Sequence, residues 1–139
     1  MIFIYHYSME LLDRYIKEIE ADLVLDEMNI RDVQLRLPSK KHFWVGRLIK
    51  HKVEINVLQK QKEELKKSLL ERVISDAPVA ISKITAEKRI DDFQEVALLN
   101  KKIKELEYVV ELLEKVEKNF NSMTYDIKNV IEILKLEQQ

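Results

Sequence analysis

The sequence predicts a mainly α protein: a short N-terminal helix, then two long helices in an antiparallel hairpin. Glycine and proline, which interrupt helices, occur only once and twice in 139 residues. Apolar residues recur every three or four positions over most of the chain, the period of one face of a helix. We expect an N-terminal helix and extended arm at 1–38, and an oligomerising helical hairpin at 39–139 as a single structural unit.

The first predicted helix begins after Ser8, a residue type that caps helix N-termini. Its apolar positions lie on one helical face, and charged residues fill the other: the apolar set is Leu12, Tyr15, Ile16, Ile19 and Leu23.

Apolar and polar residues alternate from Val33 to Leu37, just before Pro38, and this pattern is typical of a short strand. Residues 2–7 are its one potential partner within the chain. The segment is therefore either an extended arm or a strand shared between subunits.

A long helix is expected from Lys40 to about Ser75, with Ser39 as its N-cap after Pro38. One line of side chains along it has the 3/4 spacing of a partly polar coiled-coil seam: Leu48, His51, Ile55, Leu58, Lys62, Leu65, Leu69 and Arg72.

A second long helix should follow Pro78, with Ser82 or Thr85 as its cap, because neither glycine nor proline occurs from there to Gln139. The polar stretch 119–124 is where a break would cost least. The seam of this helix comprises Leu99, Ile103, Leu106, Val110, Leu113, Val116, Phe120, Met123, Ile127, Val130 and Leu134.

A two-helix hairpin is too thin to bury both seams within one subunit, and the second helix carries further apolar residues off its seam. We therefore expect a homo-oligomer. We assign the subunit interface to the C-terminal part of the second seam: Phe120, Met123, Ile127, Val130 and Leu134.

Several functional classes are excluded or unsupported. Gly46 is the only glycine, so glycine-rich phosphate loops and dinucleotide-binding turns cannot form, and without cysteine there is no thiol chemistry. His42 and His51 are about 2.5 helical turns apart, too far to share one metal ion within a helix. We expect a non-enzymatic protein without metal or cofactor. No apolar run approaches the roughly 20 residues of a membrane span, so we expect no membrane partner and a cytoplasmic location.

Charge is distributed unevenly although the net charge is only −1. Residues 40–72 carry ten basic and four acidic side chains, whereas the segments on either side are acidic. Basic side chains neutralise phosphates, and exposed rings stack on unpaired bases, so this composition is typical of a single-stranded nucleic-acid surface. Lysine-rich outer faces of coiled coils are, however, usually only solvated.

On the nucleic-acid interpretation, the candidate DNA-binding residues are Lys40, Lys41, Arg47, Lys50, Lys60, Lys62, Lys66, Lys67 and Arg72. Phe43 and Trp44 are candidates for base stacking, although such residues more often belong to a core.

Two stretches of the sequence resemble phage recombination mediators of the UvsY family. One runs from Pro38-Ser39-Lys40-Lys41-His42-Phe43-Trp44 through Arg47-Leu48, Lys50-His51-Lys52 and Leu58; the other is Ser122-Met123-Thr124-Tyr125-Asp126-Ile127-Lys128-Asn129 with Ile131-Glu132-Ile133 and Lys135-Leu136-Glu137.

The resemblance implies a non-enzymatic hexamer or heptamer that binds single-stranded DNA. Such a protein loads a RecA-like recombinase onto DNA covered by single-strand-binding protein, in the host bacterial cytoplasm if the protein is phage-encoded. In the family, a Lys-x-Arg pair late in the central helix contributes to DNA binding. Here Arg72 matches the arginine but Leu70 replaces the lysine, so the contact falls to Lys66 or Lys67.

Two other functions share the predicted architecture. A structural coiled-coil adaptor or assembly scaffold would not bind nucleic acid. A helical holdase chaperone would depend on exposed apolar hairpin tips. An enzyme is the weakest interpretation.

Overall fold

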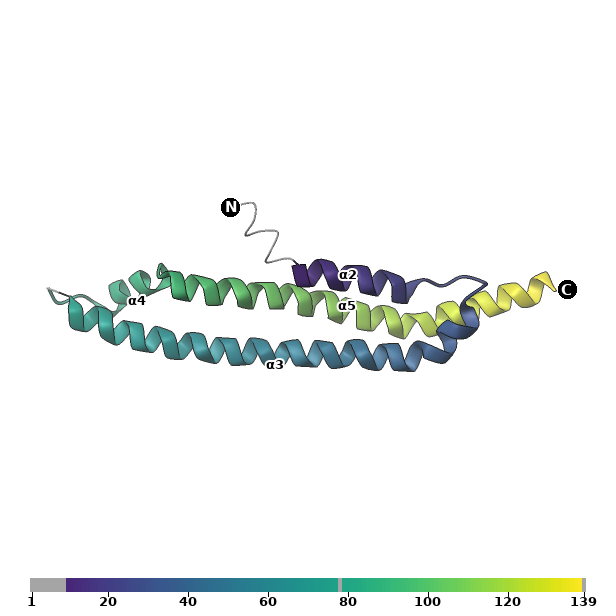
Figure 1. Cartoon of the computed structure of the whole chain (residues 1–139), viewed down its shortest axis with the longest axis horizontal. Coiled ribbons are helices and arrows are strands. Elements are labelled where there is room, and N and C mark those ends of the chain that lie inside the picture. Colours follow the sequence, from purple (N-terminus) through teal and green to yellow (C-terminus); the bar gives the residue numbers. More distant parts are fainter. Residues whose placement is uncertain (1–9, 78, 139) are drawn as a thin grey trace. The chain divides into compact units, whose positions relative to one another are not determined.

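The computed structural model describes residues 10–77 and 79–138, and within these ranges the chain forms four helices and no strand (Figure 1). The helices are α2 (Glu10–Leu23), α3 (Ile30–Asp76), α4 (Lys83–Asp91) and α5 (Gln94–Glu137). The mainly α class with two long helices is confirmed. The proposed cap Ser8 and strand partner 2–7 lie outside the described residues.

The chain divides into two compact units. Unit 1 combines Met1–His51 with Tyr108–Gln139, and unit 2 is Lys52–Glu107. Helices α3 and α5 each contribute one part to each unit. Within each unit the two parts run antiparallel, which confirms the predicted pairing.

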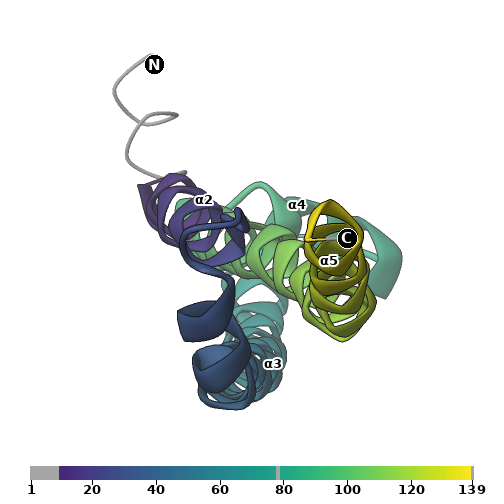
Figure 2. The same cartoon turned by 90° about the vertical axis from the view of Figure 1, so that its right-hand side faces the viewer.

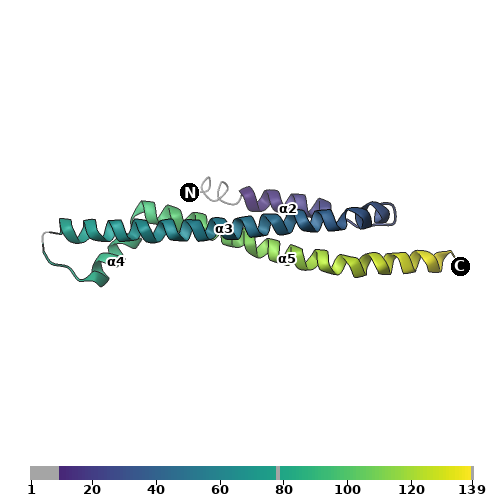
Figure 3. The same ribbon diagram turned by 90° about the horizontal axis from the view of Figure 1, so that it is seen from below.

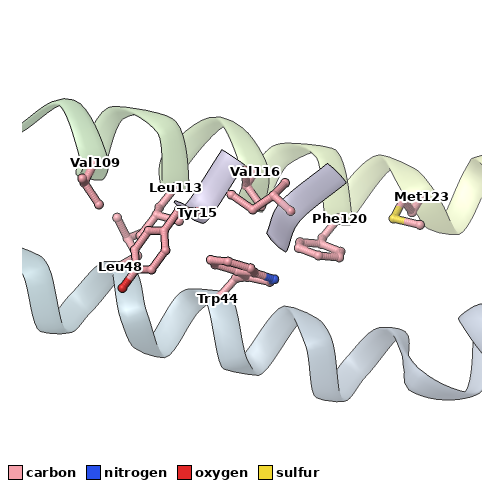
Figure 4. Packing of buried hydrophobic residues seen from close by; sticks show 9 residues of the cluster. Tyr15, Trp44, Leu48, Val109, Leu113, Val116, Phe120 and Met123 are labelled. Atoms are coloured by element: carbon pink, nitrogen blue, oxygen red, sulfur yellow. The ribbon is translucent and has the colours of Figure 1, made fainter. Parts of the chain in front are cut away.

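In unit 1, helix α2 packs on both α3 and α5 (Figure 2). The core contains Tyr15 and Ile19 from α2, and Trp44 and Leu48 from α3. The α5 residues of this core follow the predicted seam, with one off-seam addition: Val109, Leu113, Val116, Phe120 and Met123. Figure 4 shows Leu48 beside Leu113 and the Trp44 indole beside Val116 and Phe120. The period-3.6 pattern therefore located the core correctly, and α2 supplies a third layer.

In unit 2, α3 and α5 are joined by the short helix α4, which follows the end of α3 (Figure 3). Leu69 of α3, Ile90 of α4 and Val96 of α5 form its buried cluster. Ser82 caps α4, since its Oγ accepts a hydrogen bond from the Thr85 N–H at 3.2 Å. This bond confirms one of the two expected caps.

The long C-terminal helix is divided between Asp91 and Gln94 rather than near residue 120. The N–H groups of Asp92 and Phe93 bond back to the carbonyls of Arg89 and Ile90, which closes α4. Phe93 packs against the buried cluster of unit 2, so tertiary packing fixes this break.

Helix α5 continues through the polar stretch 119–124. Its Ser122 hydroxyl donates to the carbonyls of Lys118 and Asn119, at 3.0 and 3.2 Å. The buried side chains of Phe120 and Met123 anchor the same turn in the core of unit 1.

The predicted strand at 33–37 is wrong, because this segment forms early turns of α3. Val33 and Leu37 pack against the core of unit 1, whereas Leu35 is 70% exposed. In a strand these three side chains would share one face, but in a helix the first and third lie together and the second points away. The alternation therefore fits both periods, and packing selects the helix.

The start of the long helix is also different from the prediction, because α3 begins at Ile30 and contains Pro38. Ser39 is therefore an interior residue. A polar turn precedes the helix, in which Asp26 Oδ1 accepts hydrogen bonds from the N–H groups of Met28 and Asn29. Pro38 cannot donate to the carbonyl of Gln34. Both residues are exposed, so water can bond to that carbonyl.

Candidate nucleic-acid interface

Two of the basic candidates in unit 1 are held by carboxylates of α2. Lys40 Nζ lies 3.0 Å from Asp22 Oδ1, and Arg47 Nη1 lies 2.6 Å from Glu18 Oε2. Asp22 also accepts a 2.8 Å hydrogen bond from the Trp44 indole N–H, and its side chain is only 15% exposed. The acidic residues of α2 thus fix both its docking and the positions of two α3 cations.

Arg47 is further held by three aromatic rings. Its guanidinium carbon lies 4.1 Å from the centroid of Phe43, 4.8 Å from Tyr15 and 4.9 Å from Trp44. Such cation–π contacts favour a guanidinium that is partly withdrawn from water. Arg47 is therefore engaged on several sides before any ligand arrives.

The two aromatic candidates occupy different environments. Trp44 is 1% exposed and lies in the core of unit 1, in an edge-to-face contact with Tyr15 (Figure 4). Its faces are not accessible, so the structure places it as a core residue. Phe43 is 46% exposed and contacts Trp44 edge-on, with 5.3 Å between ring centroids. Only Phe43 presents ring surface to solvent.

His51 is buried against Tyr15 of the same core. Its Nε2 lies 2.8 Å from the Tyr15 hydroxyl, and the residue is 7% exposed. No group of three or more metal-ligating side chains occurs in residues 10–77 and 79–138.

The basic candidates of unit 2 likewise fall into two sets. Lys62 Nζ donates to the side-chain oxygen of Asn100 at 3.0 Å, and Lys66 Nζ lies 2.7 Å from Asp91 Oδ1. Both lysines face the neighbouring helices. Lys60, Lys67 and Arg72 are exposed, and none of them has an ion pair within the described part of the chain.

Across both units, structure thus separates the nine predicted DNA-binding residues into four with local partners and five without. The residues without an ion pair or side-chain hydrogen bond in the described ranges are Lys41, Lys50, Lys60, Lys67 and Arg72. This separation could not be read from α3 alone, because the partners come from α2, α4 and α5.

A cavity of about 330 Å³ opens in unit 2 between α3 and α4. Lys66 and Lys67 line it from α3, and Lys83 lines it from α4. Lys83 was not among the predicted site residues. No local pattern marks Lys83, because the residues that face it across the cavity belong to α3.

Three of the five predicted interface residues are already buried within the chain. Phe120 and Met123 belong to the core of unit 1, and Ile127 is 4% exposed. The seam of α5 is therefore buried within one chain up to Ile127, and the assignment of these residues to a subunit interface stays a prediction. Val130 and Leu134 are half-buried, and Ile133 and Leu136 near the end of α5 are 52% and 69% exposed.

One carboxyl group has a displaced pKa. Desolvation by partial burial raises the pKa of Glu105 in unit 2, and the nearby charges of Lys102 and Lys101 oppose that rise.

Comparison with known proteins identifies the fold. The structure is similar to the crystal structure of the bacteriophage T4 recombination mediator protein UvsY, with a TM-score of 0.80. The alignment covers 91% of this chain and 98% of the T4 chain, at 13% sequence identity. The predicted resemblance is thus confirmed at the level of the fold. No protein-family model matches the sequence, and no curated protein is similar to it in sequence.

Within residues 10–77 and 79–138, no helix is both long and apolar enough to cross a membrane.

Proposed function

We propose that this protein is a recombination mediator that binds single-stranded DNA and helps to load a RecA-like recombinase onto DNA covered by single-strand-binding protein. The observation that carries the proposal is the fold, shared over nearly the full length of both chains with a protein described as a recombination mediator. The basic residues of α3 without local partners support it independently.

In this proposal the exposed cations of α3 contact phosphates without reading sequence. Lys60 and Lys67 are separated by seven residues, two turns of helix, and so lie on one face of α3. Arg72, which matches the family's arginine, follows further along the same helix. Each contact is weak alone, and a homo-oligomer, expected as a hexamer or heptamer, would add them into useful avidity.

The subunit contact in this proposal uses the end of α5. Val130 and Leu134 continue the seam but are only half-buried, and Ile133 and Leu136 add exposed apolar surface beside them. Apolar surface of this kind is typical of an interface with another chain.

The test is salt-dependent binding of fluorescent oligo-dT, measured by anisotropy, with a matched pair of charge-reversal variants. Lys60, Lys67 and Arg72 are changed to Glu in one variant; Lys101, Lys118 and Lys128, all exposed on α5, are changed in the control. Both have the same net charge. We expect the first variant to lose at least tenfold in affinity and the control to lose much less.

Native mass spectrometry with and without the oligonucleotide gives the oligomeric state in the same preparation. Binding that is independent of salt, or equal losses in the two variants, would contradict the phosphate-contact mechanism. An oligomer indifferent to DNA would instead favour the structural scaffold.

A further inference from the structure

The cavity between α3 and α4 has the features of a site for one nucleotide. Three lysines from two helices line it, Lys66 and Lys67 from α3 and Lys83 from α4. Its volume of about 330 Å³ lies at the lower end of the range for small-molecule sites. That volume suits a single unpaired nucleotide and is far too small for a duplex.

Helix α4 holds Lys83 in a defined position. The Ser82 hydroxyl caps the helix through the Thr85 N–H, and it also hydrogen-bonds the Thr85 hydroxyl at 2.8 Å. Ala86 and Ile90 are 0% and 2% exposed, so they anchor α4 in unit 2. Lys83 is the first residue of this helix, where the backbone dipole favours an anion.

The charges around the cavity leave two ammonium groups unpaired. Lys66 is occupied by Asp91 at 2.7 Å. Lys67 and Lys83 have no ion pair in the described ranges, and Glu87 is the one other carboxylate in the lining. An anion between Lys67 and Lys83 would therefore gain two charge-assisted contacts against one repulsion.

The remaining lining residues are apolar. Leu70 of α3 is half-buried and Ile90 of α4 is buried, and both reach the cavity. A planar base needs apolar contact area, which the half-buried side chain of Leu70 offers beside the lysine pair, above the buried Ile90.

We propose that this cavity holds one nucleotide of the bound strand, with a phosphate between Lys67 and Lys83 and the base against Leu70 at the wall that Ile90 closes. The inference rests on the proposed function. It adds α4 to the DNA-binding surface and assigns a binding role to Lys83.

The first test compares Lys83→Ala with Lys88→Ala in the full chain. Both change one exposed lysine of α4, but only Lys83 lines the cavity. We expect Lys83→Ala to weaken oligo-dT binding about fivefold and to lower the slope of log affinity against log salt by about 0.7, the value of one phosphate contact on a single strand. Lys88→Ala should leave both quantities unchanged.

A variant of opposite sign strengthens the test. Glu87→Gln removes the carboxylate that opposes an anion in the cavity, so oligo-dT binding should tighten about twofold. Weaker or unchanged binding by this variant would count against a phosphate at that place.

The base is tested by the methyl resonances of Leu70 and Ile90. They should shift on addition of oligo-dT and stay in place with an abasic oligonucleotide of equal length. Equal shifts with both would overturn the placement of the base.

The two proposals can fail separately. If the wild-type chain binds no oligonucleotide at any salt concentration, the proposed function fails and the nucleotide site with it. If the chain binds while Lys83→Ala and Lys88→Ala behave alike, only the nucleotide site is overturned.

Discussion

The two units use the basic residues of α3 differently. In unit 1, Lys40 and Arg47 are bound by carboxylates of α2, and Arg47 is also enclosed by aromatic rings. In unit 2, Lys66 pairs with Asp91 of α4 and Lys62 donates to an amide oxygen of α5, and neither has a cation–π contact among the described residues. The difference shows that a count of positive charges along a helix overstates its binding surface, because neighbouring helices neutralise part of it.

The largest expected effect separates core from surface in unit 1. Trp44→Ala removes a side chain that is 1% exposed and donates to Asp22, so we expect a loss of about 4 kcal/mol in the free energy of unfolding. Chemical denaturation followed by circular dichroism measures it. A loss below 1 kcal/mol would show that the indole is not part of the core.

Phe43 offers the matching test on the surface of unit 1. Because its ring is 46% exposed, Phe43→Ala should change the stability by less than about 1 kcal/mol. If Phe43 stacks on a base, as the proposed function allows, oligo-dT affinity should fall about tenfold. Unchanged affinity would show that Phe43 does not stack on a base and only contacts Arg47 and Trp44.

The sequence predicted the apolar faces, which repeat at regular spacing along the chain, and missed features that depend on packing against distant residues. The 3/4 spacing identified the apolar faces of α2, α3 and α5, because burial of one face needs only a period. The start of α3 was missed, since Val33, Leu35 and Leu37 satisfy two periods and Pro38 with Ser39 suggested that the helix begins there. Packing against the core of unit 1 decides between these alternatives, and no local pattern records it.

The site was predicted in composition but not in accessibility. The pairing of Arg47 with Glu18 joins residues 29 positions apart, and that of Lys66 with Asp91 depends on the fold of α4. Lys83 was not predicted for a related reason: the cavity that it lines is formed together with residues of α3. Residue type and helical face are local properties, whereas it is the folded unit that decides whether a charged side chain is paired or accessible.

A smaller effect tests whether α2 restrains the cations of unit 1. Glu18→Gln removes the carboxylate 2.6 Å from Arg47, so that arginine can turn toward a phosphate. We expect oligo-dT affinity to rise about threefold, within the modest energy of a partly exposed ion pair. The control is Glu20→Gln, which makes the same change of net charge at an exposed position of α2. Equal increases in both variants would mean that only net charge matters.

The smallest expected effect concerns Glu105 of unit 2, because burial destabilises the charged form of its carboxyl group. Burial raises its pKa, so the folded chain binds this proton more readily than the unfolded chain does. Between the unfolded and the folded pKa the native state therefore carries more protons, and its stability falls as the pH rises through that interval. Above the folded pKa the full cost of the buried charge is present.

Glu105→Gln removes this cost, so the variant should melt at a higher temperature than the wild type at pH 7. The difference should disappear below the unfolded pKa of the carboxyl group. Thermal melts at a series of pH values measure this. A difference that is the same at every pH would show that the amide improves packing, and that the charge of Glu105 does not limit the stability of unit 2.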